Sequence, residues 1–255
     1  MPIRKIIDDR QTTPEALLHD RHYMAYTVAL ERVPPGCKML EIGHGPGYGL
    51  DLLASKVDII GLDIVPSIVE FARKEYPNRR FELYDGARIP FDDEHFDAAC
   101  MFQVIEHVPD DVAMLKEVLR VLRDGGTLIL TTPNQVLRVP YGERPWNEEH
   151  VREYYPEELA EVMANAGFAK VEILGIDASD AYREVELKRV ARSRRLRRLD
   201  PLGLRRLLPD QLLYKLGRKI VSAGKAKGEK QPDGEFFVTA TDLYRSLDLL
   251  GIGTR

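Results

Sequence analysis

A glycine-rich segment preceded by one acidic residue is the first feature of the sequence that could do chemistry. Glycine occupies every second position from Gly43 to Gly49 in KMLEIGHGPGYGLDLL, and Glu41 lies just before this run. Such glycines permit a sharp turn and let a ligand approach the backbone without side-chain collision. The spacing is neither the G-x-G-x-x-G dinucleotide motif nor a P-loop, and no Lys or Arg lies in the loop to bind a pyrophosphate. An acid at this place favours a cationic ligand over a phosphate.

Two further acids follow at the ends of predicted strands. Asp63 closes GLDIV about 20 residues after the glycine turn, a spacing suited to hydrogen bonds from both ribose hydroxyls of an adenosine. Asp85, in LYDGARIPF, could contact the adenine amino group. Each aspartate alone is more commonly a helix cap or a turn residue. Three acids at three successive strand ends, around one glycine loop, form a much more specific pattern.

The elements that must position these acids alternate between strands and helices. Helices separate the predicted strands KMLEI, VDIIGLDI, RFELYD, FDAACMFQV, GGTLILTTP and AKVEILGI, and the last predicted strand is GEFFVTATDL. Such alternation predicts a parallel sheet covered on both faces, with ligands at the carboxyl ends of its strands. We divide the chain into a helical lead-in or lid (1–36), a core (37–181), a basic helical insertion (182–232), and a last strand with a C-terminal tail (233–255).

These motifs, in this order, resemble the class I S-adenosylmethionine-dependent methyltransferases, in the branch with ubiquinone-type, sugar and natural-product enzymes. The likeness covers roughly residues 38–176 and includes LEIGHGPGYG, GLDIV, YDGARIPFDDEHFDAACMFQVIEHVPD and EVLRVLRDGGTLILTTPN. It implies a Rossmann-like α/β fold, a doubly wound, seven-stranded, mostly parallel sheet with a final antiparallel strand. It also implies S-adenosyl-L-methionine as the cofactor and S-adenosyl-L-homocysteine as the product.

The resemblance assigns cofactor contacts position by position. The positions are Glu41, Gly43, Gly45 and Gly47 at the methionine moiety, Asp63 and Ile64 at the ribose, Asp85, Gly86 and Ala87 at the adenine, Gln103 just past the fourth strand, and Arg21 and Tyr23 in an N-terminal lid.

Catalytic candidates come from two other segments. Methyl transfer needs the nucleophile about 3 Å from the methyl group and, for a hydroxyl, a group that removes its proton. QVIEHVPDD offers Glu106 and His107, and RPWNEEHVREYYPEEL offers His150. Histidine changes charge near neutral pH, so His107 is the first candidate for a general base. For both histidines a structural role, in a helix cap or a loop, stays open.

A metal-assisted methyl transfer is an alternative. Small-RNA 3′-terminal 2′-O-methyltransferases resemble this chain in an E-x-x-E-H motif and a later histidine, which bind a divalent metal there. Here Gln103 replaces the first glutamate, and this removes a charge that a hard cation favours. We therefore assign no metal ligand from the sequence.

Composition bounds the class and the compartment. The 255 residues are 44% hydrophobic and 31% charged, which suits one domain of generous size or a domain with an insertion. No run of about 18 apolar residues predicts a membrane span, and the N-terminus lacks a secretory signal. The two cysteines, Cys37 and Cys100, lie far apart, which favours a reducing cytoplasm.

The basic segment suggests a partner. From Arg183 to Lys230 the chain has 16 Lys and Arg against 5 Asp and Glu, although its net charge is −4. Two interpretations of this segment are open. It could be a solvated insertion over the substrate cleft, or it could bind an anionic surface, such as a membrane face or a phosphorylated lipid-linked acceptor. RNA is less favoured, because only Tyr182 and Tyr214 could stack on bases.

We predict methyl transfer to an oxygen of a small-molecule, glycan or lipid-linked acceptor in the cytoplasm, with a peripheral position at the membrane surface as an option. Nitrogen and carbon acceptors are less favoured. Three alternatives remain: the metal-assisted RNA 2′-O-methyltransferase, a NAD-binding oxidoreductase, and a non-catalytic protein that binds S-adenosylmethionine or nucleic acid.

Overall fold

The computed structural model describes residues 14–138, 145, 147, 149–198 and 236–255. The chain divides into two compact units, Met1–Ala178 with Phe236–Arg255, and Ser179–Glu235. In the described part of the first unit the helices are α2 (Pro14–Arg32), α3 (Tyr48–Leu53), α4 (Pro66–Glu75), η1 (Ile105–His107), α5 (Asp111–Val121), α6 (Gln135–Arg138), α7 (Pro156–Ala166) and η3 (Leu243–Arg245). Its strands are β1 (Lys38–Ile42), β2 (Asp58–Asp63), β3 (Arg80–Leu83), β4 (Phe96–Phe102), β5 (Leu122–Pro133), β6 (Lys170–Ala178), β7 (Phe236–Thr239) and β8 (Asp248–Thr254).

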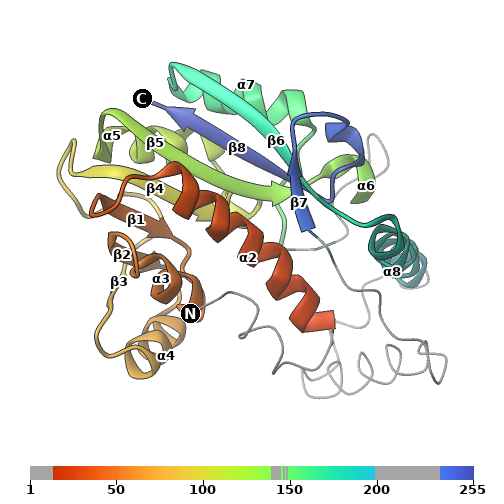
Figure 1. The fold of residues 1–255 in the computed structure, drawn as a ribbon, viewed down its shortest axis with the longest axis horizontal. Helices are drawn as coiled ribbons and strands as arrows, with labels where there is room; N and C mark the ends of the chain where they lie inside the picture. Colours follow the sequence, from red (N-terminus) through yellow and green to blue (C-terminus); the bar gives the residue numbers. More distant parts are fainter. Residues whose placement is uncertain (1–13, 139–144, 146, 148, 199–235) are drawn as a thin grey trace. The chain divides into compact units, whose positions relative to one another are not determined.

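One mixed sheet runs through the first unit, with the strand order β3-β2-β1-β4-β5-β8-β6-β7 (Figure 1). The first five strands form parallel pairs: β3 with β2, β2 with β1, β1 with β4, and β4 with β5. β8, in contrast, is antiparallel to both β5 and β6. The Rossmann-like, mostly parallel α/β class is thereby confirmed. Because the parallel strands end at the same edge, the segments after Ile42, Asp63 and Phe102 all lie there.

The C-terminal part of the sheet differs from the prediction. Within the described residues the sheet has eight strands rather than seven, and GEFFVTATDL supplies only β7, an edge strand paired with β6. The antiparallel strand between β5 and β6 is β8, which lies in the segment predicted to be a C-terminal tail. β8 contains Gly251 and Gly253, and glycine weakens the pattern by which a strand is predicted from sequence.

Apolar side chains pack on both faces of the sheet. On one face α5 and α7 contribute Leu115 and Met163 to a core with Leu40. On the other, α2 and α3 contribute Ala29 and Leu50 to a second core, and Figure 1 shows α2 lying across this face. The strands are largely apolar, as expected for parallel strands that are buried on both faces.

In the second unit the structure describes α8 (Asp180–Arg198). Its charges form local ion pairs, such as Lys188 with Glu184 and Arg189 with Glu186. Most of the predicted basic insertion, residues 199–232, lies outside the described residues. No helix in the described part of the chain combines the length and apolar character needed to cross a membrane.

Candidate functional site

The glycine loop joins β1 to α3 in a conformation that glycine favours. Gly43, Gly45 and Gly47 have φ angles of +74°, +52° and +90°. A Cβ atom on Gly43 would lie 2.4 Å from Cγ2 of Val104, so this position has no room for a side chain. A Cβ atom on Gly45 would meet nothing within 4 Å, so the backbone there faces open space. A ligand can therefore approach the loop at Gly45.

Glu41, at the end of β1, is buried with one oxygen engaged. The Tyr26 hydroxyl on α2 donates a hydrogen bond of 2.6 Å to its Oε1, and Oε2 is buried with no hydrogen-bond partner among the described residues. Burial raises the pKa of Glu41 to about 8; the bond from Tyr26 opposes this rise and the charge of Asp63 adds to it. A buried carboxylate with a free oxygen is suited to a cationic group.

Asp63, at the end of β2, connects the loop to the next strand. Its Oδ2 accepts a hydrogen bond of 3.1 Å from the backbone N–H of Gly45, and its Oδ1 accepts one of 3.0 Å from that of Val65. Next to it Ile64 is 57% exposed, which is unusual for an isoleucine. A Cβ atom on Gly86 would lie 3.2 Å from Cγ2 of Ile64, so these two predicted residues are neighbours.

Asp85 is an exposed turn residue in the structure. Its Oδ1 accepts hydrogen bonds from the backbone N–H groups of Ala87 and Arg88, at 2.8 and 3.0 Å. These two bonds lower the pKa of Asp85. These two hydrogen bonds hold the segment Asp85–Ala87 as a turn.

The remaining predicted cofactor residues lie in different settings. Gln103 has a φ of +57° and donates its backbone N–H to the carbonyl of Thr131 at 2.9 Å. Arg21 is buried on α2, where its Nε lies 2.8 Å from Oδ2 of Asp248. Tyr23 is half-buried on the same helix. The structure thus gives Arg21 an acidic partner within the protein.

The three predicted catalytic residues lie together. One potential ligand atom from each of Glu106, His107 and His150 lies within 4.8 Å of the other two. The His107 and His150 rings are perpendicular, with centroids 4.8 Å apart. Backbone contacts hold the two segments in place, because the carbonyl of Glu106 accepts from the N–H of Val151 at 2.8 Å and Nδ1 of His107 lies 2.9 Å from the carbonyl of Glu149.

Glu106 is the buried member of this cluster. Its Oε2 accepts a hydrogen bond of 3.1 Å from the Thr132 hydroxyl on β5. The pKa of the Glu106 carboxyl is raised to about 8, chiefly by burial; the Thr132 hydrogen bond and the Arg138 guanidinium oppose the rise, and the charge of Asp248 contributes to it. His107, in contrast, is exposed, so the cluster spans the boundary between core and solvent.

Sequence reasoning missed three residues of the site. Tyr26 is not among the residues predicted for the site, although its hydroxyl donates a hydrogen bond to Glu41. Glu153 is 2% exposed, and its Oε1 lies 2.8 Å from Nδ1 of His150; the spacing of three residues in HVRE is the one available signal. His44, within the glycine loop, is buried against Phe81, and burial lowers its pKa.

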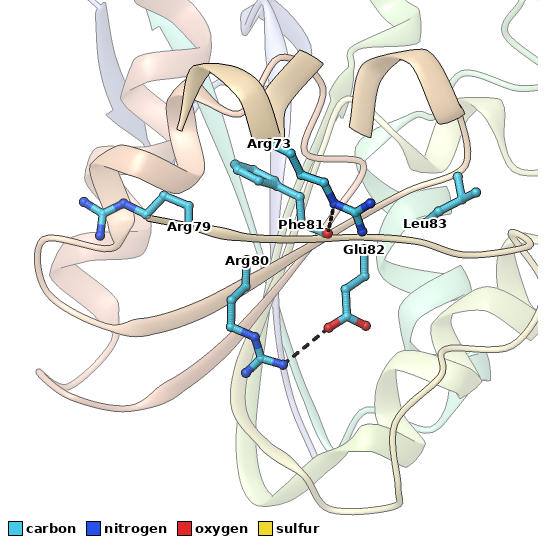
Figure 2. Close-up of a pocket in the computed structure, with 6 residues that line it drawn as sticks. All are labelled: Arg73, Arg79, Arg80, Phe81, Glu82 and Leu83. Carbon is cyan, nitrogen blue, oxygen red and sulfur yellow. Dashed lines mark hydrogen bonds and ion pairs between the residues drawn. The ribbon is translucent and has the colours of Figure 1, made fainter. Parts of the chain in front are cut away.

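A surface cavity of about 610 Å³ lies elsewhere, along edge strand β3 and α4 (Figure 2). Its lining residues are Arg73, Arg79, Arg80, Phe81, Glu82 and Leu83. Arg73 donates to the carbonyl of Phe81, and Arg80 pairs with Glu82, as Figure 2 shows. No predicted site residue lines this cavity, so it is separate from the candidate site.

Comparison with known proteins gives consistent matches. A family model described as a methyltransferase domain matches residues 40–130. A "probable S-adenosylmethionine-dependent methyltransferase" of Mycobacterium tuberculosis is 31% identical over 182 residues, covering 70% of this chain and 66% of that protein. A protein of the same description from Mycolicibacterium smegmatis is 37% identical over 157 residues, covering 61% of each chain. This chain thus spans just under two thirds of these relatives' lengths.

Solved structures show the same fold. A Thermotoga maritima protein, described as an S-adenosylmethionine-dependent methyltransferase and possible histamine N-methyltransferase, has a TM-score of 0.59 at 20% identity, covering 93% of this chain and 91% of its own. The cyclase SpnF has a TM-score of 0.52 at 26% identity, covering 62% of this chain and 60% of its own. At 20% identity, the likeness to the Thermotoga maritima protein concerns the fold alone.

Proposed function

We propose that this chain, which belongs to the class I S-adenosylmethionine-dependent methyltransferase family, transfers a methyl group from S-adenosylmethionine to an oxygen of a small-molecule, glycan or lipid-linked acceptor. Membership of the family rests on the matched methyltransferase domain and on the relatives named for this cofactor. The residues assigned to the cofactor and to catalysis, and the kind of acceptor, belong to the proposal.

The loop residues fit the cofactor that the family uses. The unpartnered Oε2 of Glu41 offers a carboxylate oxygen to a cationic group, and the open space at Gly45 lets a ligand lie against the backbone. The Asp63 carboxylate suits a ribose diol, and Ile64 beside it is exposed, as a residue that contacts the ribose must be. The buried, half-satisfied Glu41 carries the proposal, because no other described residue needs its second oxygen.

The chemistry at the acceptor falls to the cluster of Glu106, His107 and His150. When bound, the cofactor supplies a methyl group already activated by its sulfonium. The protein must orient the acceptor hydroxyl and accept its proton, and an unprotonated imidazole nitrogen of His107 or His150 serves as that base. Glu153, 2.8 Å from Nδ1 of His150, positions this ring and stabilises it once protonated.

The other readings have less support. The glycine spacing is not that of a dinucleotide-binding motif, and the matched family model is a methyltransferase domain, so neither supports an oxidoreductase that binds NAD. A protein that has kept the fold without methyl transfer is the stronger alternative, because the similar structure of SpnF is named as a cyclase. Binding of the basic segment 182–230 to an anionic surface, or to RNA, stays a prediction for residues that are mostly outside the described part.

Transfer of a ¹³C-labelled methyl group tests the proposal. The chain is incubated with S-adenosylmethionine labelled at the methyl carbon and with small-molecule, glycan and lipid fractions. The chemical shift of the labelled methyl distinguishes oxygen, nitrogen and carbon acceptors. We expect an O-methyl product. A chain that binds S-adenosylhomocysteine yet labels no fraction would instead support the non-catalytic alternative.

Variants of the histidines then test the base. We expect His107→Ala and His150→Ala to lower kcat by about 100- to 10,000-fold with little change in the affinity for S-adenosylhomocysteine. The control His95→Ala changes a ring that contacts Phe91 and Phe96, outside the cluster. Unchanged kcat in both cluster variants would contradict the assigned role.

A further inference from the structure

We propose that Glu106, His107 and His150 bind one divalent transition-metal ion of the zinc type. The convergence of one carboxylate and two imidazoles, with potential ligand atoms all within 4.8 Å, is the observation behind this inference. From the sequence we assigned no metal ligand, because Gln103 lacks the charge that a hard cation favours. Two imidazoles form a different kind of site, since imidazole suits zinc and related transition metals better than magnesium.

The hydrogen bonds of the two imidazoles leave a metal-binding nitrogen on each ring. Nδ1 of His107 lies 2.9 Å from the backbone carbonyl of Glu149. A carbonyl oxygen only accepts hydrogen bonds, so Nδ1 carries the proton and Nε2 of the neutral ring keeps a lone pair. His150 is held in the same way, with its Nδ1 2.8 Å from Oε1 of Glu153. Histidines that ligate metals typically donate their other N–H to a carbonyl or a carboxylate in this manner.

The third ligand and its surroundings also suit a cation. Glu106 is 1% exposed, and the Thr132 hydroxyl donates to its Oε2, which orients the carboxylate as hydrogen bonds orient metal-binding carboxylates elsewhere. Glu153 adds a second buried acid beside the cluster, and its Oε2 has no hydrogen-bond partner among the described residues. A divalent ion would stabilise the ionised form of these buried carboxyl groups. The exposed His107 ring provides access from solvent.

The geometry requires only a small adjustment. Metal–ligand distances of about 2.0–2.2 Å place the ligand atoms of a tetrahedral site about 3 to 3.5 Å apart, somewhat less than the present limit of 4.8 Å. His107 lies at the end of the one-turn helix η1 and is exposed, so rotation of its side chain can close the difference. Three protein ligands leave at least one coordination position open.

An oxygen ligand in the open position would have its pKa lowered by the ion. An acceptor hydroxyl bound there would lose its proton to solvent water more readily, so the reaction would not need a free imidazole as the base. This role of the ion rests on the proposed function. The binding of the ion does not, so the two can be tested separately.

Titration with Co²⁺ and Zn²⁺ tests the site directly. The chain, without a histidine tag and stripped with a chelator, is titrated with Co²⁺ while its visible d–d absorption is recorded, and Zn²⁺ is then added as a competitor. We expect one ion per chain with a Kd in the micromolar range or below. His107→Ala and His150→Ala should each weaken binding at least 100-fold, and Glu153→Gln about 10- to 100-fold. The control His95→Ala should bind as the wild type does.

Wild-type protein without saturable one-to-one binding would overturn the proposal, as would binding that survives both histidine substitutions. Thermal unfolding shows whether each variant is folded. If His150→Ala unfolds, the exposed His107 still gives the test. Because the titration contains neither cofactor nor acceptor, a chain that fails to bind S-adenosylhomocysteine but binds zinc would reject the proposed function and keep this site.

Discussion

At the level of single residues, Glu41 combines deep burial, next to Tyr26, with a proposed role in binding the cofactor. The carboxylate is 1% exposed, and its one hydrogen bond among the described residues comes from a tyrosine on another element. Burial keeps its pKa near 8, so much of it is protonated at neutral pH when no cation is near. A cationic ligand would favour the ionised form.

Glu41 should make the stability of the folded chain depend on pH. The pKa of Glu41 rises from 4.5 to about 8 on folding, so the folded chain binds this proton more tightly than the unfolded chain. The contribution to stability is full below pH 4.5 and is lost as the pH rises toward about 8. The raised pKa of Glu106 also lowers stability as the pH rises, but it does so equally in the wild type and in Glu41→Gln. The difference between the two proteins therefore reports on Glu41 alone. We expect the Tm of the wild type to fall more than that of Glu41→Gln over this range; parallel Tm curves would contradict the assignment.

The second prediction concerns Tyr26. Tyr26→Phe removes the donor to Oε1 and leaves the Glu41 carboxyl without a hydrogen bond among the described residues. We expect a loss of about 1–3 kcal/mol in the free energy of unfolding, measured by urea denaturation. Tyr23→Phe, on the same helix, is the matched control and should change it by less than about 0.5 kcal/mol. Equal effects of the two substitutions would show that the Tyr26 hydroxyl contributes nothing specific.

Sequence alone could place the predicted acids and histidines but not their partners. Glu41 and Asp63 were predicted because residues next to a strand end follow from local pattern. Their contacts depend on packing between distant segments: Tyr26 reaches Glu41 from α2, and the link between Glu106 and Val151 joins segments that are 45 residues apart. No local pattern carries that information.

At the scale of elements, β8 shows why the last strand was misplaced. Its glycines are required by the close approach of α7 and the turn after it: a Cβ atom on Gly253 would lie 2.7 Å from Cδ1 of Phe168, and one on Gly251 would lie 2.7 Å from Sδ of Met163. β1 and β4, in contrast, contain no glycine and were located within a few residues. Packing, and not β-propensity, selects the residues of β8.

The third prediction follows from this contact. Gly253→Ala places a methyl group against the Phe168 ring, so the helix or the ring must move. We expect a loss of about 1–3 kcal/mol in the free energy of unfolding, measured by urea denaturation. The control Lys170→Ala, at an exposed position of the neighbouring β6, should cost less than about 0.5 kcal/mol. A Gly253→Ala chain as stable as the control would show that β8 and Phe168 pack less closely than described.

At the level of the whole molecule, the order and direction of the strands bring the predicted site residues to one edge of the sheet. Parallel pairing of β1, β2, β3 and β4 brings four loops to one edge of the sheet, and these carry the glycine turn, Asp63, Asp85 and the Glu106–His107 segment. α2 covers the adjoining face and supplies Tyr26. The edge therefore joins a candidate cofactor site and a candidate catalytic cluster, as ligand sites in open α/β sheets usually are.

Calorimetric titration with S-adenosylhomocysteine would show whether this chain binds the cofactor through Asp63. The wild type, Asp63→Ala, the milder Asp63→Asn, and the control Asp58→Ala, at the exposed opposite end of β2, are compared after thermal unfolding has shown each to be folded. We predict micromolar binding by the wild type and Asp58→Ala, weaker binding by Asp63→Asn, and no measurable binding by Asp63→Ala. No binding by the wild type, or equal binding by all four proteins, would contradict the account.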